Sequence, residues 1–169
     1  SISLSHIANT LADNIFGMTK GTKKVIVTDL DYTFWHGVLG ELGPKDIEGS
    51  SDGLGYMHFI YQSFLKKLQN AGILLCISSK NDHDLVESAF KENDFVVNYE
   101  EFVSINASYN PKSSEIKKIS DSINIGLEDF VFIDDNPVEI EEVKSVLPSV
   151  TCIQFPKDVT QLPIFLDQL

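Results

Sequence analysis

Carboxylate side chains follow two apolar segments of the sequence. Asp29 and Asp31 lie in the segment KVIVTDLDYT, and Asp134 and Asp135 end the segment FVFIDD. If both segments end at one place, the carboxylates repel one another and their pKa values rise. A hard divalent cation removes that cost, and Mg²⁺ suits a site whose ligands are all oxygen atoms. The acidic residues therefore predict a magnesium site.

A lysine and a serine complete a set of groups suited to phosphoryl transfer. Lys112 follows Pro111, and Ser79 ends the segment ILLCISS. In such a site one carboxylate attacks phosphorus, a metal and an ammonium group neutralise the phosphoryl oxygens, and a second acid protonates the leaving group. Asp29 and Asp31 are two residues apart in an extended segment, so we expect their side chains to point to the same side. We expect one of them to attack and the other to donate the proton.

Apolar segments and helical patterns alternate along the chain. Runs of β-branched and apolar residues predict strands, and apolar residues at helical spacing between start and stop signals predict helices. Strands separated by helices imply an α/β fold of three layers, with a parallel central sheet and helices on both faces. Ligands bind beyond the carboxyl ends of the strands in such sheets, which is where the polar residues lie. The predicted strands are 24–30, 73–78, 102–104, 130–134 and 150–155, and the predicted helices are 55–72, 81–93, 111–126 and 136–148.

The length of the chain, 169 residues, predicts one domain with one sizeable core. We expect residues 1–22 to form a peripheral N-terminal helix and linker, and residues 23–169 to form the catalytic domain. Residues 36–55 are rich in glycine and lack strong periodicity, which predicts a flap or hairpin after the first strand and not a second domain.

Charge and composition exclude several classes of function. The net charge is −12 and all thirteen cationic side chains are lysines, so the chain lacks a basic face for nucleic acid and an arginine to clamp a phosphate. No stretch reaches the ~18 apolar residues of a membrane span. Cys76 and Cys152 lie in apolar segments, which favours buried free thiols in a reducing compartment. We therefore expect a cytoplasmic protein that binds neither nucleic acid nor membrane.

The ordered motifs resemble those of the haloacid dehalogenase (HAD) phosphohydrolase superfamily. The resemblance rests on DLDYT, then Ser79, then Lys112, then the Asp-Asp pair of FIDDNP, and it spans nearly the whole chain. It implies the Rossmann-like HAD fold, here without a large cap because only the flap at 36–55 follows the first strand. It also implies roles: Asp29 as nucleophile and Mg²⁺ ligand, Asp31 as general acid and base and as a metal ligand through its backbone carbonyl, Ser79 and Lys112 as phosphoryl ligands, Asp134 as a Mg²⁺ ligand, and Asp135 beside it or acting through a water.

Three longer stretches are similar to the FkbH-like subgroup of that superfamily: DLDYTFWHGVLGELG, SSKND and FIDDNPVE. Members of the subgroup occur alone or as polyketide-synthase domains, and they convert 1,3-bisphosphoglycerate into a glyceryl thioester on an acyl carrier protein. The resemblance implies a small acyl phosphate as substrate, carrying a glyceryl or a related lactyl unit. It implies the phosphopantetheine thiol of an acyl carrier protein as partner. A stand-alone protein and a part of a larger multidomain synthase both fit this interpretation.

Ser78 is the largest departure from the subgroup pattern. The subgroup has cysteine at this place, and that thiol is expected to hold the acyl group before transfer. A neutral serine hydroxyl is a much poorer nucleophile than a thiol that is partly thiolate near neutral pH. Cys76 lies deeper in the strand, so we do not expect it to substitute. Ser78 is either an introduced change or a natural divergence, and Tyr32, Phe34 and His36 also replace the subgroup's asparagine, leucine and glycine.

Four residues near these motifs have two interpretations each. Lys80 and Asn81 either cap the following helix or stand at the mouth of the site. Trp35 and His36 either line the pocket as flap residues or are ordinary hairpin residues. The other histidines have no partners in the motif set, and we expect surface or packing roles for His6, His58 and His83.

Three functions fit these residues. The first is phosphate removal coupled to loading of a three-carbon acyl group onto a carrier protein. The second, which Ser78 favours, is a plain Mg²⁺-dependent phosphatase that acts on a phosphoprotein or phosphometabolite. The third is a phospho-acceptor module of flavodoxin-like shape, but this class expects an acceptor aspartate after the third strand, where FVSINAS has none. The charge of −12 opposes docking on an acidic carrier protein, so a lysine patch or tethering would have to compensate.

Overall fold

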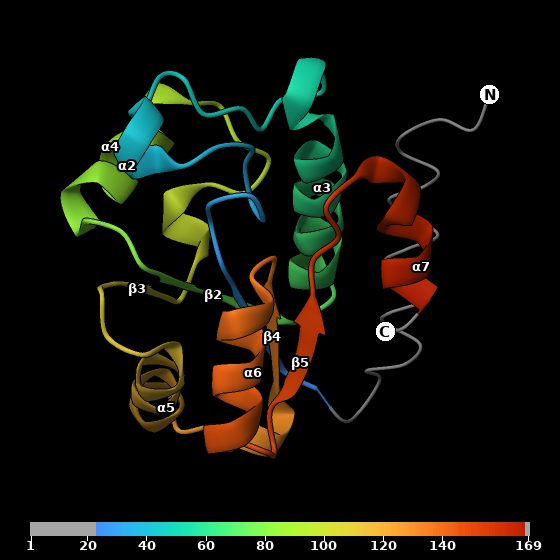
Figure 1. Ribbon diagram of the computed structural model, residues 1–169. Helices are drawn as coiled ribbons and strands as arrows, with labels where there is room; N and C mark the ends of the chain where they lie inside the picture. Colours follow the sequence, from blue (N-terminus) through green and yellow to red (C-terminus); the bar gives the residue numbers. More distant parts are fainter. Residues whose placement is uncertain (1–22, 168–169) are drawn as a thin grey trace.

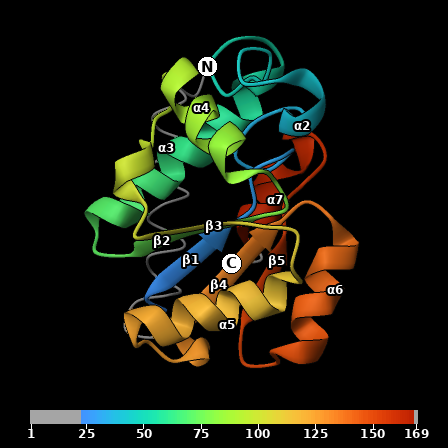
Figure 2. The ribbon, with the colours of Figure 1, turned by 90° about the vertical axis from the view of Figure 1, so that its left-hand side faces the viewer.

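The computed structural model describes residues 23–167, which form one parallel sheet with helices on both faces (Figure 1; Figure 2). The strand order is β3-β2-β1-β4-β5, and every neighbouring pair is parallel. The expected three-layer α/β fold is confirmed, whereas the element expected at 1–22 lies outside the described residues. The strands are β1 (Val25–Thr28), β2 (Leu74–Ser79), β3 (Ser104–Ala107), β4 (Phe130–Asp134) and β5 (Thr151–Gln154).

The helices divide between the two faces of the sheet. Helices α3, α4 and α7 share one hydrophobic core with the sheet, and α5 and α6 share the other (Figure 2). None of the helices within residues 23–167 is long and apolar enough to cross a membrane. The helices are α2 (Leu39–Leu42), α3 (Tyr56–Asn70), α4 (His83–Glu92), α5 (Lys112–Ile123), α6 (Pro137–Val146) and α7 (Leu162–Asp167).

The central strand β1 shows why the apolar runs become strands. Its side chains alternate between the faces, so that Val25 and Val27 pack against α5 and α6, while Ile26 packs on the α3 side. All four residues of β1 are buried. A strand buried on both faces needs a nearly continuous apolar sequence, which is what VIVT supplies.

The chain reverses its direction of travel across the sheet between β1 and β4. After β1 it builds β2 and β3 on one side, and then returns to place β4 on the other side of β1. Thr28 pairs with Ile133 at this point, and the Asp29 N–H donates to the Ile133 carbonyl at 2.9 Å. Loops that leave the carboxyl ends of β1 and β4 diverge, so this edge of the sheet opens into a crevice suited to a ligand.

The flap at 36–55 packs onto the core. It contains α2 and a short 3₁₀ turn, Gly53–Gly55, and an antiparallel bridge joins His36 to Glu48. The side chains of Leu39 and Ile47 are buried in the core shared with α3 and α4. The flap is therefore a fixed wall beside the carboxyl ends of the strands.

Two elements differ from the sequence expectations. The third strand is β3 at Ser104–Ala107 and not 102–104. Phe102 belongs to the core after the turn Tyr99–Glu101, and the residues that pair with β2 are SINA. This edge strand is only half-buried, so it has no continuous apolar run to mark it. Helix α7 follows a 3₁₀ turn near the end of the chain and was not expected from the sequence.

Gly55 is a sensitive packing position where the flap joins α3. A Cβ atom there would lie 2.9 Å from the backbone of Glu48, Gly49 and Ser50, none of which is a flexible side chain. We expect Gly55→Ala to lower the free energy of unfolding by about 1–3 kcal/mol. Gly40→Ala is the matched control, because a Cβ at Gly40 meets nothing within 4 Å. Urea unfolding followed by circular dichroism measures both, and equal losses would contradict the packed flap.

Candidate active site

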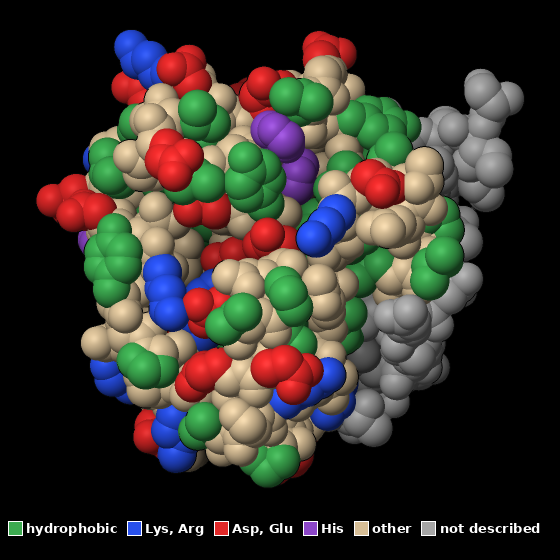
Figure 3. Space-filling model, viewed as in Figure 1, with side chains coloured by type: hydrophobic (Ala, Val, Ile, Leu, Met, Phe, Trp, Pro, Cys, Tyr) green, Lys and Arg blue, Asp and Glu red, His purple; other side chains and the backbone are tan. Residues whose placement is uncertain are grey.

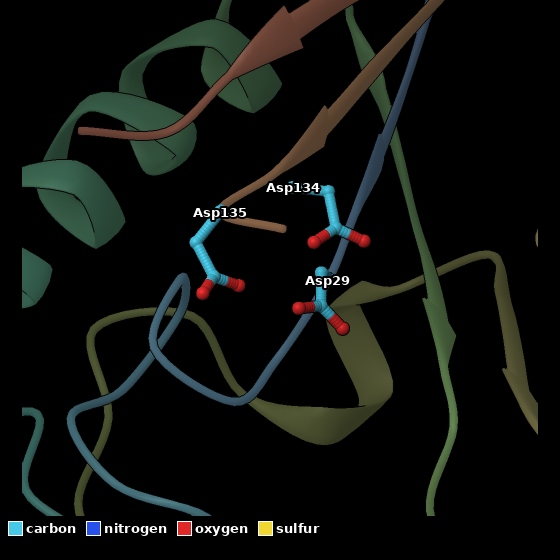
Figure 4. Close-up of side chains that lie close together, drawn as sticks. All are labelled: Asp29, Asp134 and Asp135. Carbon is cyan, nitrogen blue, oxygen red and sulfur yellow. The ribbon is translucent and has the colours of Figure 1, made fainter. Parts of the chain in front are cut away.

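Three carboxylates converge where β1 and β4 end. Asp29 directly follows β1, Asp134 is the last residue of β4, and Asp135 follows it. One oxygen from each lies within 4.8 Å of the others, and Figure 4 shows the three side chains directed toward a common space. Asp29 and Asp134 are buried and Asp135 is half-buried. The crevice predicted at the topological switch is thus an acidic site.

Lys112 neutralises part of this charge. It is the first residue of α5 and only 3% exposed. Its Nζ lies 2.8 Å from Asp29 Oδ1, forms a second ion pair with Asp134 Oδ2, and lies 5.7 Å from the centre of the Phe132 ring. Buried charges are costly unless they are paired, and here one buried ammonium group pairs with two buried carboxylates.

Hydrogen bonds from two directions fix the start of α5 and hence Lys112. The Ser113 backbone N–H donates to Glu142 Oε2 of α6 at 3.1 Å, and the Ser113 hydroxyl also bonds to Glu142. Glu115, in the first turn of α5, accepts from Asn106 of β3 at 2.9 Å and from Asn110 at 3.0 Å. Acidic side chains near the free N–H groups of a helix start are favourable, so both glutamates stabilise α5 where Lys112 needs it.

The pKa values show that the cluster carries too much negative charge for its surroundings. Burial and the neighbouring Asp29 carboxylate raise the pKa of Asp134 to about 8, against the opposing effect of Lys112. The same two causes raise the pKa of Asp135 to about 6. Burial alone would lower the pKa of Lys112, but Asp29 and Asp134 outweigh it and raise that pKa, so the ammonium group stays charged.

The donor set fits Mg²⁺. Asp29, Asp134 and Asp135 offer only carboxylate oxygens, which are the ligands that hard divalent cations prefer. The raised pKa values of Asp134 and Asp135 reflect the cost of burying negative charge at this place, and a bound divalent cation would remove that cost. The three carboxylates, with the Asp31 backbone carbonyl that the motif implies, are the groups that would hold the ion.

Asp31 lines the same pocket, but its carboxylate does not belong to the group of three converging acids. Asp31 Oδ1 accepts from Trp35 Nε1 at 2.9 Å and from the Leu39 N–H at 3.0 Å, and Oδ2 accepts from Asn81 Nδ2 at 3.0 Å. Burial raises the pKa of Asp31, although these three hydrogen bonds oppose the rise. A carboxyl group that is held in place and has a raised pKa is suited to donate a proton.

The residues at the end of β2 and just after it have two kinds of position: some line or support the acidic pocket, and one stands at its rim. Ser79 lines the pocket of about 210 Å³ that holds the acids, and Asn81 Nδ2 bonds to Ser79 Oγ at 2.9 Å as well as to Asp31. Asn81 therefore joins two pocket residues, while the capping of α4 that was its alternative role falls to Asp82, whose side chain accepts from two backbone N–H groups of the helix. Lys80 stands at the rim, where it pairs with Glu139 of α6 at 2.7 Å.

Ser78 and Cys76 lie outside this pocket. Ser78 is 1% exposed, and its hydroxyl is the one buried side-chain oxygen or nitrogen between residues 23 and 167 without a hydrogen-bond partner. Because strand side chains alternate, Ser78 points to the opposite face of the sheet from Ser79. Cys76 is buried on that same face, and burial raises its pKa to about 12, so its thiol is unreactive.

Trp35 and His36 were both candidates for lining the pocket, but Trp35 lies in the core and His36 lines an adjoining cavity. Trp35 is fully buried and stacks on Phe95 with ring centres 5.6 Å apart, so it does not line the pocket and the pocket-lining interpretation is wrong for this residue. It serves the site through its bond to Asp31. His36 is half-buried and lines a second, adjoining cavity together with Tyr32.

The structure adds residues that sequence reasoning did not place in the site. Thr33 Oγ1 donates to Asp135 Oδ1 and accepts from the Asp135 N–H, both at 3.1 Å, which orients the third acid. The threonine of the DLDYT motif was a usable signal for this role. His58 was expected to be a packing or surface residue; it is buried against Phe155, but it also lines the adjoining cavity. A single histidine in a helix pattern carries no signal of that.

Solved structures resemble this fold. The chain matches the N-terminal part of the protein BF1531 from Bacteroides fragilis, which contains a phosphatase domain and is complexed with Mg, at 33% sequence identity and a TM-score of 0.83. The match covers 93% of this chain and 42% of that one, so the chain spans less than half of its length. A scan against protein-family models and a search of curated proteins gave no match.

Two more distant matches show the same fold. One is the HAD family enzyme bt-2542 from Bacteroides thetaiotaomicron in complex with magnesium and inorganic phosphate, at 13% identity and a TM-score of 0.54, covering 83% of this chain and 98% of that one. The other is a putative 3-deoxy-D-manno-octulosonate 8-phosphate phosphatase from Vibrio cholerae, at 18% identity and a TM-score of 0.53, covering 92% and 75%. The fold is that of HAD phosphatases, which is the fold that the motifs implied.

Removal of the Lys112 charge tests the cluster. We expect Lys112→Met to lower the free energy of unfolding of the metal-free protein by about 3–5 kcal/mol, because it leaves buried carboxylates unpaired. Mg²⁺ should restore part of the loss. Lys117→Met is the matched control, since Lys117 is an exposed residue of the same helix that pairs with Asp121. Urea unfolding with EDTA and with Mg²⁺ measures both, and equal small losses would contradict a charge-paired cluster.

Proposed function

We propose that this chain is a Mg²⁺-dependent phosphohydrolase of the HAD superfamily. The observation that carries the proposal is the convergence of Asp29, Asp134, Asp135 and Lys112 at the switch point between β1 and β4. Asp31 and Ser79 line the same pocket of about 210 Å³, which is open to solvent on the side of Lys80 and Glu139. A pocket of this size, lined by oxygen atoms and by the Lys112 ammonium group, suits a phosphoryl group.

The reaction divides into two displacements at phosphorus. In the first, a carboxylate oxygen of Asp29 bonds to phosphorus, the bond to the leaving oxygen breaks, and Asp31 gives its proton to that oxygen. In the second, Asp31 takes a proton from water, the water oxygen bonds to phosphorus, and inorganic phosphate leaves while the Asp29 carboxylate is restored. The Lys112 ammonium and the Ser79 hydroxyl hold the phosphoryl oxygens through both steps. A bound Mg²⁺ ion would supply the remaining positive charge.

The hydrogen bonds of Asp31 suit it to act first as a proton donor and then as a proton acceptor. Trp35, Leu39 and Asn81 all donate to its carboxylate and hold it in one place at the edge of the pocket. Its raised pKa favours the protonated state that the first displacement needs. Because Asp29 has no such set of donors and contacts Lys112 instead, we assign attack to Asp29 and proton transfer to Asp31.

A trapped phosphoenzyme tests this assignment. We expect Asp31→Asn, given acetyl phosphate and Mg²⁺, to accumulate a phosphoryl adduct, because acetate leaves without a proton from Asp31 but hydrolysis of the adduct slows by roughly 10²–10⁴-fold. Asp29→Asn should show neither adduct nor phosphate release, and the exposed Asp46→Asn should match the unchanged chain. Intact-protein mass spectrometry and a phosphate assay measure these results. A long-lived adduct on the unchanged chain would instead support the phospho-acceptor interpretation.

A second candidate function adds acyl transfer to a carrier protein. It is supported by the FkbH-like stretches of the sequence and by one feature of the site: the unpartnered Ser78 hydroxyl occupies a buried position in which a less polar cysteine would be at home. In this candidate the substrate is a three-carbon acyl phosphate and the acceptor is the phosphopantetheine thiol of an acyl carrier protein. Ser78 is fully buried and is not among the residues that line the acidic pocket, which favours phosphate removal alone.

An assay with bisphosphoglycerate, Mg²⁺ and a carrier protein that bears a free phosphopantetheine thiol separates the two candidates. With this chain we expect phosphate release and no acyl mass on the enzyme or on the carrier, because position 78 offers no thiol. The Ser78→Cys variant is the matched test of the acyl-transfer role. An acyl mass on that variant or on its carrier would establish the second candidate, whereas phosphate release without any acyl mass from both proteins would leave the phosphatase.

A further inference from the structure

A cavity of about 650 Å³ adjoins the acidic pocket. The two share Tyr32 and Asp135, so a molecule whose phosphate lies among the acids reaches the cavity directly. In Figure 3 acidic side chains form the floor of a hollow, with histidine and hydrophobic side chains beside it. The cavity lies between the start of the flap, the start of α3 and the loop after β5. Its apolar walls come from Leu54, Tyr56, Met57, Pro156 and Val159.

The walls select against a strongly polar occupant. A cavity of this volume holds a small organic body, and specificity in such cavities comes from a few well-placed polar groups. Here Lys157 is the single cationic side chain in the wall, and it belongs to an exposed loop. A second phosphate would face the carboxylates of Asp135 and Asp158 with only Lys157 to offset their charge, and the rest of it would lie against apolar side chains, which is costly. The lining instead suits an apolar body.

His58 places one hydrogen-bond acceptor in this apolar wall. Its Nδ1 lies 2.7 Å from the Thr33 carbonyl, and because a carbonyl only accepts, Nδ1 carries the proton. Burial lowers the pKa of His58 to about 4, so the ring is neutral and Nε2 is a bare acceptor. The ring is held by stacking on Phe155, and within residues 23–167 no side chain donates to Nε2.

Tyr32 forms the partition between the two spaces and is held in an unusual conformation. Its φ is 56°, in the left-handed region that bulky residues rarely adopt, at a cost of about 1–2 kcal/mol. A turn in which Thr33 and Phe34 donate to the Leu30 carbonyl maintains it, and its ring meets His36 edge-on at 5.2 Å. Strain of this kind persists at sites that use it. Here it presents an aromatic ring that is 44% exposed to any body entering the cavity.

We propose that the cavity binds the leaving group of the phosphate substrate, and that this group is an apolar body, aryl or branched alkyl, with one hydroxyl or amide N–H that donates to His58 Nε2. The inference rests on the proposed phosphohydrolase function and names its substrate class. Tyr32 and His36 form the aromatic side of the subsite, and Leu54, Met57 and Val159 form the aliphatic side. The leaving oxygen lies at the boundary with the acidic pocket, within reach of Asp31.

Turnover of four phosphates tests the subsite. Acetyl phosphate is too small to fill the cavity, glycerol 3-phosphate has a polar body, and benzyl phosphate and its hydroxymethyl-substituted derivative have apolar bodies. We expect kcat/KM for benzyl phosphate to exceed that for glycerol 3-phosphate by roughly tenfold or more, as apolar contacts in a pocket provide. We expect the hydroxymethyl derivative to be better still, and His58→Phe to remove that advantage while keeping a ring of similar shape.

A substitution at the exposed rim of the cavity tests the subsite without disturbing the core of the protein. Leu54 is 64% exposed, so Leu54→Glu is tolerated by the fold but places a charge at the cavity; we expect the ratio of benzyl to acetyl phosphate turnover to fall roughly tenfold. Val146→Glu, at the far end of α6, is the matched control and should leave that ratio unchanged. Acetyl phosphate turnover without any preference for apolar bodies would overturn this inference alone. No turnover of acetyl phosphate would overturn the phosphohydrolase proposal and this inference with it.

Discussion

The ion pairs of Lys112 with Asp29 and Asp134 are the interaction on which the site depends. Three carboxylates meet at the end of two buried strands, and without a cation their repulsion would be too costly to bury. The position of Lys112 in turn depends on α5 starting at one place, which the bonds of Ser113 to Glu142 ensure. The relative positions of β1, β4, α5 and α6 therefore together place the Lys112 ammonium group against the buried carboxylates.

Much of the fold follows from the sequence because the central strands are buried on both faces. Strands β1, β2 and β4 are continuous apolar runs, and a parallel order places their carboxyl ends at one edge. The edge strand β3 is half-buried, and its four residues alternate between polar and apolar types, a pattern too short to stand out from the loops around it. Its register comes from pairing with β2. The flap is fixed because Leu39 and Ile47 are buried in the core. This packing is a tertiary effect, and the glycine-rich sequence of the flap gives no sign of it.

The candidate site divides in the same way. The acids, Lys112 and Ser79 were expected to meet because each ends or begins an element at the same sheet edge, and the structure places all of them around one pocket. The adjoining cavity was not expected, because it is assembled from three separate segments. The roles of Tyr32 and His58 depend on backbone conformation and on a bond to the Thr33 carbonyl, neither of which a residue pattern encodes. The sequence left the role of Trp35 open for the same reason: its ring belongs to the core, and only its Nε1 reaches Asp31.

We propose Asp29 as the nucleophile of a metal-dependent phosphoryl site. A crystal structure with Mg²⁺ and beryllium fluoride, which mimics a phosphoryl group bonded to a carboxylate, tests it most directly. We expect the fluoride adduct on a carboxylate oxygen of Asp29, with Lys112 and Ser79 against its fluorine atoms and the metal held by Asp29 and Asp134. An adduct on another carboxylate, or a metal bound away from the ends of β1 and β4, would contradict it.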